Sequence, residues 1–227
     1  MFDRIKQALG WWGSSPSAEL QSVAVFSEAL RSAFDKELLA RGFEHVKALK
    51  WVRSTKPEIR DVIELYSLKG ASVAPRWGFS LDFVPHVAAG RLRWHRTAKS
   101  SMLDLVWDPL DFSGVGGWTP SRFVALSELP RLAKDFAAKV CRAALPDLAK
   151  AQQVSDLPAL YREWAARPTV RFSIENYPQA RLGEAFVLKR LGLPGAMECL
   201  PADVTQDLDD ATRRELLALL EAGSPPV

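Results

Sequence analysis

The chain has 227 residues, of which 48% are hydrophobic and 25% are charged, a composition typical of a globular protein with one large domain or two small ones. No apolar run approaches the roughly 20 residues of a membrane-spanning helix. The N-terminus also lacks the pattern of a signal peptide, so we expect a cytoplasmic protein.

The first 12 residues predict a short amphipathic helix, because apolar side chains recur in them at intervals of three and four residues. Residues 13–17, Gly-Ser-Ser-Pro-Ser, should end this helix, so we expect residues 1–17 to form a helix and a linker. A helix this short is marginal in water, and it should dock on its own core, on a partner protein or on a membrane surface. A peripheral membrane contact would use Phe2, Ile5, Leu9, Trp11 and Trp12.

A long helix is expected over residues 19–40, where five apolar side chains form one stripe and Gly42 follows as a stop signal. The stripe consists of Val23, Phe26, Leu30, Phe34 and Leu38. We expect this helix to lie across the apolar face of a sheet.

The next two segments are expected to be β-strands. Residues 43–53 contain Val46, Trp51 and Val52 with basic residues between them. Residues 58–69 are ambiguous, because the spacing of their apolar side chains also fits a helix, whereas their content of Val, Ile and Tyr favours a strand. We predict a strand for both segments.

Residues 76–86 and 91–97 are expected to form an antiparallel hairpin, with a loop at residues 87–90. Period-two alternation places large apolar side chains on one face of each strand. These side chains are Trp77, Phe79, Leu81 and Phe83 in the first strand and Leu92 and Trp94 in the second. We expect them to face the core, with Arg91 and Arg93 on the polar face.

The same alternation predicts a register in which Phe83 lies opposite Trp94, since a slip by one residue would put Trp94 on the polar face. In this register Asp82 lies opposite His95, and a carboxylate that faces an imidazole is a candidate acid and base pair. The two residues could instead form a surface charge pair that fixes the strands. The absence of a nucleophile or a metal-ligand cluster beside them favours the surface pair.

Residues 102–107 complete the set of strands, with Leu103, Leu105 and Trp107 on one face and Asp104 on the other. The sequence therefore predicts an α+β fold, in which an antiparallel β-meander of about five strands packs against the long N-terminal helix. A mainly helical C-terminal half should follow. We expect residues 18–112 to form the sheet domain.

The order of these elements resembles an uncharacterised bacterial family, a domain of unknown function. In that family a helix ends in Gly-Phe, here Gly42-Phe43, and a strand with a Trp follows, here Trp51. A strand rich in Ile and Val comes next, here residues 59–65. The resemblance covers about residues 24–86. It implies a bacterial protein, and it carries no assigned activity and no functional residues.

Residues 113–227 predict a mainly helical region that packs on the sheet as one unit. Helices are expected at about 127–146, 155–164, 179–191 and 209–222, with a short strand at 170–174. The glycine-rich run at 113–117 lacks the Lys-Ser or Lys-Thr that completes a phosphate-binding loop. We therefore interpret this run as a loop without a ligand.

Few residues in the chain are suited to metal or nucleophilic chemistry. His45, His86 and His95 are the only histidines, and Cys141 and Cys199 are the only cysteines. They show neither zinc-ligand nor disulfide spacing, and no hydrolase or nucleotide-binding motif occurs. We expect no metal site and no cofactor, and a binding protein is favoured over an enzyme with an unrecognised site.

Positive charge is concentrated in the predicted sheet. Residues 41–100 carry 12 Lys and Arg against 5 Asp and Glu, a net charge of +7, whereas the whole chain carries +3. This asymmetry predicts an acidic partner. The candidate binding residues are Lys47, Lys50, Arg53, Arg91, Arg93, His95 and Arg96, and Lys56 and Lys99 belong to the same basic segments.

Two classes of partner fit these residues. An acidic protein would be held by Arg and aromatic side chains, as in a complex subunit or a neutralising or accessory protein. A nucleic acid would need cations for its phosphates and exposed rings for its bases. Because the alternation assigns Trp77 and Trp94 to the core, the cations lack stacking platforms, and we favour the acidic protein.

Overall fold

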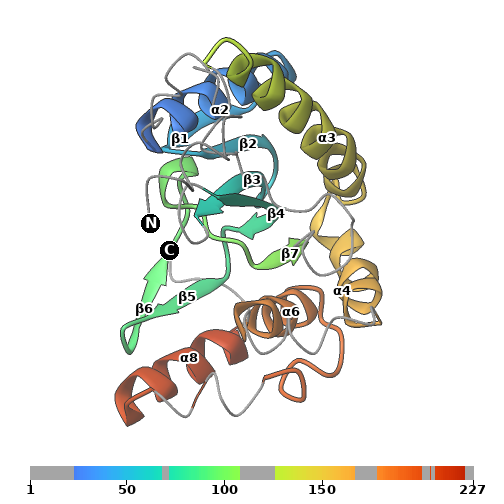
Figure 1. Ribbon diagram of the computed structural model, residues 1–227. Helices are drawn as coiled ribbons and strands as arrows, with labels where there is room; N and C mark the ends of the chain where they lie inside the picture. Colours follow the sequence, from blue (N-terminus) through green and yellow to red (C-terminus); the bar gives the residue numbers. More distant parts are fainter. Residues whose placement is uncertain are drawn as a thin grey trace, which may run out of the picture.

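The protein consists of a five-stranded antiparallel sheet, a separate two-stranded sheet and a set of helices (Figure 1). The structure, a computed structural model, describes residues 23–67, 72–107, 126–166, 178–200, 205 and 208–222. The helix expected at residues 1–12, the glycine-rich run at 113–117 and the strand expected at 170–174 lie outside these ranges.

The main sheet has the strand order β1-β2-β3-β4-β7, and each strand is antiparallel to its neighbours. Its strands are β1 Glu44–Lys47, β2 Lys50–Lys56, β3 Ile59–Ser67, β4 Val73–Leu81 and β7 Leu105–Trp107. The α+β class with an antiparallel five-stranded sheet and a helical C-terminal half is confirmed. The ambiguous segment at residues 58–69 is the strand β3, as predicted.

The segment 43–53 is not one strand, and this prediction was wrong. It forms the hairpin β1–β2, in which Lys47 pairs directly with Lys50 across a turn at Ala48 and Leu49. Neither turn residue is a Gly, Asn, Asp or Pro, the residue types that mark turns in a sequence. The sequence therefore shows no turn signal between the two strands, and residues 43–53 were predicted to be a single strand.

The expected hairpin at residues 76–97 is also divided. β4 ends at Leu81, and a turn leads into β5 Pro85–Ala88, which pairs with β6 Arg91–Trp94 in a sheet of its own. Pro85 rather than Phe83 lies opposite Trp94, so the predicted register was wrong by two residues. A shift by two keeps every side chain on its predicted face, which explains why the alternation could not exclude it.

β7 takes the place beside β4 that was predicted for the second hairpin strand. Trp77 of β4 lies opposite Trp107 of β7, and Gly78 lies opposite Val106. A Cβ atom on Gly78 would overlap the backbone oxygen of Leu105. The glycine is therefore needed for the close approach of these two strands.

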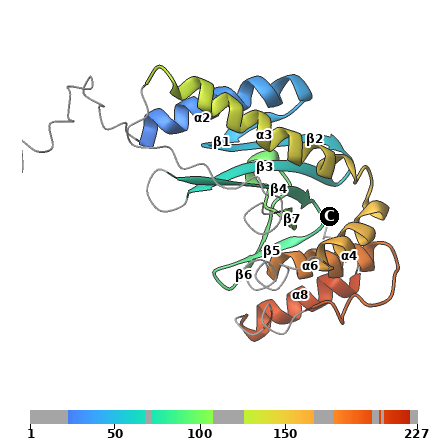
Figure 2. The ribbon, with the colours of Figure 1, turned by 45° about the vertical axis from the view of Figure 1, so that its right-hand side comes forward.

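Two helices cover one face of the main sheet. α2, Val23–Leu38, is followed by the 3-10 turn η1, Leu39–Arg41, and it lies beside α3, Leu129–Ala149 (Figures 1 and 2). The ring of Phe34 in α2 stacks on Trp51 of β2 at a centroid distance of 4.8 Å. The indole nitrogen of Trp77 donates to Asp147 of α3 at 3.0 Å.

α3 continues through Pro146, where the sequence had predicted its end. A proline inside a helix removes one backbone hydrogen bond. Pro146 is exposed to solvent, so water can satisfy the carbonyl oxygen that this proline leaves without a donor.

The remaining helices lie on the other side of the main sheet, next to the β5–β6 hairpin (Figures 1 and 2). They are α4 Leu157–Ala165, preceded by the 3-10 turn η3 Val154–Asp156, α6 Pro178–Arg190 and α8 Asp210–Ala222. α6 contacts β7, and α8 contacts β6. Side chains from both helical layers and from the sheet form one apolar cluster.

The core contains most of the large side chains that the alternation assigned to it. Trp77, Phe79, Leu81 and Phe83 are buried. Leu92 and Trp94 are the exceptions, because they lie on β6 and are only half-buried. The prediction that Trp94 belongs to the inner face of the main sheet was therefore wrong.

Candidate functional site

Five exposed cations lie on neighbouring elements of the molecule. They are Lys47 of β1, Arg91 and Arg93 of β6, and Arg96 and Lys99 in the segment that follows β6. Lys99 belongs to the 3-10 turn η2, Ala98–Ser100, which contacts both β1 and β2. We call these five residues the basic strip.

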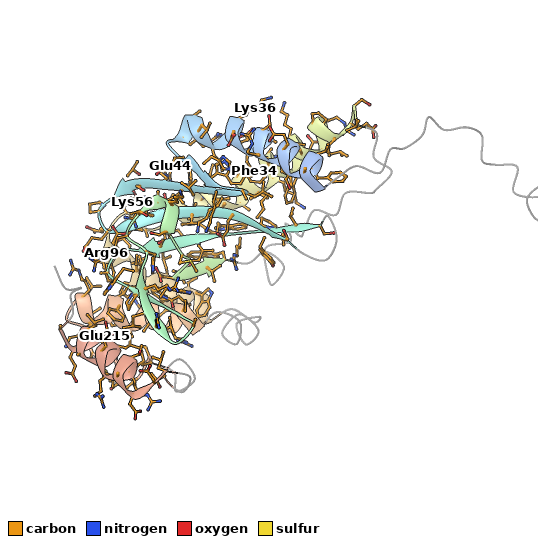
Figure 3. All side chains as sticks on the ribbon, turned by 90° about the vertical axis from the view of Figure 1, so that its left-hand side faces the viewer. Phe34, Lys36, Glu44, Lys56, Arg96 and Glu215 are labelled. Carbon is orange, nitrogen blue, oxygen red and sulfur yellow. The ribbon has the colours of Figure 1, made fainter. Side chains whose placement is uncertain are left out.

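Within the described ranges, no residue of the basic strip forms an ion pair with a carboxylate. Arg96 instead stacks on Trp94, with 4.3 Å between the guanidinium carbon and the centroid of the ring. Figure 3 shows Arg96 projecting from the surface between the level of the main sheet and that of α8, where Glu215 is labelled. The strip therefore presents positive charge to the solvent.

Other cations of residues 41–100, on the strand β2, have partners inside the protein. Arg53 Nη2 and Lys56 Nζ each lie 2.7 Å from a carboxylate oxygen of Asp61, which is 0% exposed. Lys56 Nζ also donates to the carbonyl oxygen of Leu148, in the last turn of α3, at 2.7 Å. Positive charge is favourable at this end of a helix. Lys56 thus joins the sheet to α3, and Arg53, a candidate binding residue, is held within the sheet by Asp61.

Lys50 is also an internal residue, although the sequence made it a binding candidate. It is 8% exposed, its Nζ lies 3.4 Å from Glu64, and it donates to the carbonyl oxygen of Ser101. Burial lowers the pKa of Lys50, and the neighbouring Glu64 opposes this effect. Glu64 also pairs with Arg76 of the next strand.

Arg60 holds the segment that carries the exposed cations. Its guanidinium forms a two-point ion pair with Asp82 and donates to the carbonyl oxygens of His95 and Arg96. Lys50 binds the same segment further along, at Ser101. Two buried cations therefore fix the backbone of residues 95–101 from the inside, and the side chains of Arg96 and Lys99 face outward.

The expected pairing of Asp82 with His95 is not formed. Asp82 follows the end of β4, outside the β5–β6 hairpin, and its partner is Arg60. Burial raises the pKa of Asp82, although the Arg60 guanidinium acts in the opposite direction. His95 is 2% exposed, and its Nε2 lies 2.8 Å from Oδ2 of Asp104.

Asp104 is the centre of a buried hydrogen-bond network. Besides contacting His95, its Oδ2 accepts a hydrogen bond from the backbone N–H of Leu81 at 2.7 Å. Its Oδ1 accepts from Gln179 Nε2 of α6 at 2.8 Å, and Tyr161 of α4 donates to its backbone oxygen at 3.2 Å. The network thus joins β4, the end of the hairpin and two helices.

The glycine at position 183 makes this junction possible. A Cβ atom there would overlap the hydroxyl oxygen of Tyr161 and approach the backbone of Asp104. Because the carboxylate accepts three hydrogen bonds and the imidazole is enclosed, a substrate has no access to the pair. We interpret His95 and Asp104 as a structural junction rather than a reaction centre.

The two histidines near this junction each have a buried nitrogen without a partner. In the part of the chain that the structure describes, Nδ1 of His86 and Nδ1 of His95 form no hydrogen bond. The two rings lie 6.5 Å apart, in an edge-to-face arrangement. Burial lowers the pKa of His86, and the positive charge that His95 can carry acts in the same direction.

No set of three side chains suited to a metal ion occurs among the described residues. Burial raises the pKa of the Cys141 thiol to about 12 and also raises that of Cys199, so neither thiol is activated as a nucleophile. In the ranges that the structure covers, no helix is long and apolar enough to cross a membrane.

The chain matches no protein-family model, no curated protein and no solved structure. The resemblance over residues 24–86 thus stays a prediction.

The sequence missed Asp104 as the hydrogen-bond partner of His95 and Gln179 as a further member of the same network. Asp104 did carry a signal, because it is the polar residue in the otherwise apolar segment 102–107. Gln179 carried none, since it is one polar side chain among several on a helix that lies 75 residues further along the chain. Lys99 was recognised as basic, but its place in the strip depends on the contact of η2 with β1.

Proposed function

We propose that the protein is a non-enzymatic interaction module that binds an acidic partner protein through the basic strip. The observation that carries this proposal is the set of five exposed cations without a carboxylate partner in the described part of the molecule. Like charges gathered on one surface repel one another, and an acidic surface would relieve this repulsion and steer the encounter.

The division of the cations into two groups supports the proposal. Lys50, Arg53, Lys56 and Arg60 are held by buried or half-buried carboxylates and contribute little to the surface. Residues 41–100 have a net charge of +7, and the basic strip therefore supplies most of the positive charge that this segment presents to the solvent. Arg and Trp are the residue types that most often dominate binding energy at protein interfaces, and Arg96 stacked on Trp94 supplies both.

A nucleic acid is the second candidate, and the half-buried Trp94 is the observation in its favour. Single-stranded nucleic acids bind to cationic grooves with several exposed rings, on which successive bases stack. In the basic strip the guanidinium of Arg96 already occupies one face of the Trp94 ring. This arrangement leaves few stacking positions, so the acidic protein is favoured.

The proposal can be tested with two labelled polyanions, poly-L-glutamate and single-stranded oligothymidylate, by fluorescence anisotropy. The wild-type protein should bind poly-L-glutamate more tightly, and R91E/R93E should lose at least about tenfold in affinity. The control K134E/R142E changes two exposed cations of α3 and the net charge by the same amount, and it should bind like the wild type.

Two results would contradict the proposal. If the control loses as much affinity as R91E/R93E, the attraction comes from net charge and not from the basic strip. If oligothymidylate binds more tightly than poly-L-glutamate, the nucleic acid becomes the favoured partner.

A further inference from the structure

β6 is the outer strand of a two-stranded sheet, and one of its edges is open. β5 lies on one side of it, and in Figure 1 the strand forms the outer margin of the hairpin. An open edge presents backbone N–H and C=O groups that another chain can pair with. The register of the hairpin determines which groups these are.

The two-residue turn at Ala89-Gly90 makes Ala88 and Arg91 the first pair, and such a turn hydrogen-bonds this pair. Hydrogen-bonded and non-hydrogen-bonded pairs then alternate along antiparallel strands. The backbone groups of Arg91 and Arg93 therefore face β5, and those of Leu92 and Trp94 face outward.

Pro85 provides an independent check of this assignment. It lies opposite Trp94, and its carbonyl oxygen accepts a hydrogen bond from Gln179 Nε2 of α6 at 2.9 Å. A proline also has no N–H to donate to β6. Pro85 and Trp94 are therefore a non-hydrogen-bonded pair, so the backbone groups of Trp94 point outward.

The outward groups of β6 are unused in the described part of the molecule. No backbone or side-chain hydrogen bond reaches the N–H or C=O of Leu92 or Trp94. α8 lies against the hairpin, and Leu92 belongs to the same apolar cluster as Leu216 and Leu219 of this helix. α8 thus covers the face with Leu92 and leaves the arginine face to the solvent.

We propose that the acidic partner docks as an extended antiparallel strand on the open edge of β6, with acidic side chains at two positions separated by one residue. This inference rests on the proposed function and specifies the partner. In that arrangement the two acidic side chains share one face and lie opposite Arg91 and Arg93, with Cβ atoms about 5 Å apart. The residue between them pairs its backbone with that of Leu92.

A second copy of the chain does not fit this edge. Antiparallel pairing of two β6 strands would bring arginines from the two copies together, and like charges at directly opposite positions destabilise a sheet. Basic side chains on an edge strand commonly prevent such self-pairing. The same charges favour an acidic strand, since strand addition takes affinity from the backbone and selectivity from alternate side chains.

Two synthetic peptides of equal composition test the proposal by anisotropy with the full chain. The alternating peptide is Thr-Glu-Val-Glu-Val-Thr, and the adjacent peptide is Thr-Glu-Glu-Val-Val-Thr, both labelled and capped. The alternating peptide should bind at least about tenfold more tightly. N-methylation of the Val between the two Glu residues should abolish binding, whereas N-methylation of either Glu should not, because the amide of this Val faces β6 and the amides of the two Glu residues face away from it.

Two further experiments complete the test: reversal of the charges on both protein and peptide, and amide hydrogen exchange of the wild-type complex. R91E/R93E should bind Thr-Lys-Val-Lys-Val-Thr and reject the Glu peptide. On binding of the Glu peptide to the wild-type protein, the amides of Leu92 and Trp94 should gain protection from exchange, and those of Arg91 and Arg93, already bonded to β5, should change little.

The outcomes separate this inference from the proposed function. If the alternating and adjacent peptides bind equally well and both fail to bind R91E/R93E, strand addition is overturned and the acidic-partner proposal stands. If neither peptide nor poly-L-glutamate binds the wild-type protein, both are overturned. If N-methylation at Val has no effect, the partner does not pair with the backbone of β6, and this inference is overturned as well.

Discussion

The imidazole of His95 and the carboxylate of Asp104 form a buried pair, with 2.8 Å between Nε2 and Oδ2. The pair joins the end of β6 to the start of β7, nine residues later in the chain. It therefore closes the loop that carries Arg96 and Lys99. The position of these two cations therefore depends on a contact in which no residue of the basic strip takes part.

A double-mutant cycle on this pair should show strong coupling. Replacing His95 and Asp104 by Ala, singly and together, is expected to give a coupling free energy of about 1 to 3 kcal/mol, because the residues are in direct contact. The matching cycle for Asp82 and His95, which form no hydrogen bond with each other, should give less than about 1 kcal/mol. Urea unfolding measures both, and equal values would contradict the assignment of Asp104 as the partner.

The substitution Asp61→Asn should be strongly destabilising. Asp61 is fully buried between Arg53 and Lys56, and removal of one partner from a buried charge cluster costs about 3 to 5 kcal/mol. Asp135→Asn is the control, because Asp135 and Arg131 are both 64% exposed in side-chain area and should contribute under about 1 kcal/mol. Calorimetric melting compares the two variants, and similar melting temperatures would show that the Asp61 cluster is already hydrated.

The stability of the protein should fall on mild acidification, in part through His86. Because its pKa in the folded state lies below the usual value of about 6.5, the unfolded chain binds the proton first as the pH falls. The contribution of His86 is therefore complete above about pH 6.5 and is lost as the pH falls through its lowered pKa. His86→Gln should flatten the dependence of unfolding free energy on pH between about 7 and 5. A variant with the wild-type slope would contradict the shift.

The substitution Ala89→Asn should stabilise the β5–β6 hairpin. Ala89 has a φ of 51° and Gly90 a φ of 69°, and a side chain with this left-handed conformation costs roughly 1 to 2 kcal/mol. Asn tolerates it better, and Asn-Gly is the preferred pair for such a turn. Amide exchange at Arg91 and Arg93 should slow down. Ala88→Asn, in the strand itself, should instead speed it up, since Asn disfavours strands.

The sequence predicted the elements of this fold better than their connections. The long helix α2 was recognisable, because its apolar side chains repeat at the helical period. β3 is buried on both faces, so its apolar spacing also fitted a helix, and its content of Val, Ile and Tyr identified it as a strand. The turn at Ala48-Leu49 was missed, and the loop expected at residues 87–90 contains the turn Ala89-Gly90 but was two residues too long. Three of these four residues are not typical of turns, and tertiary packing overrides local preference there.

The candidate site was predictable in its charge but not in its members. The alternation correctly placed Arg91 and Arg93 on the polar face of β6. Lys50 and Arg53 looked equivalent to them in the sequence, and only the register of β2 against β3 shows that Glu64 and Asp61 lie directly across from them. A count of charges in a segment cannot separate cations with internal partners from those that face the solvent.

The anchoring of residues 95–101 by Lys50 and Arg60 has a consequence for measurements at different ionic strengths. Dissolved ions screen exposed charges over about 8 Å at physiological ionic strength and about 3 Å at 1 M, but they act much less on buried pairs. Added sodium chloride should therefore weaken the attraction between the basic strip and a partner while the shape of the loop is preserved. Affinity that persists at 1 M salt would then measure the backbone pairing and the contact with Trp94 alone.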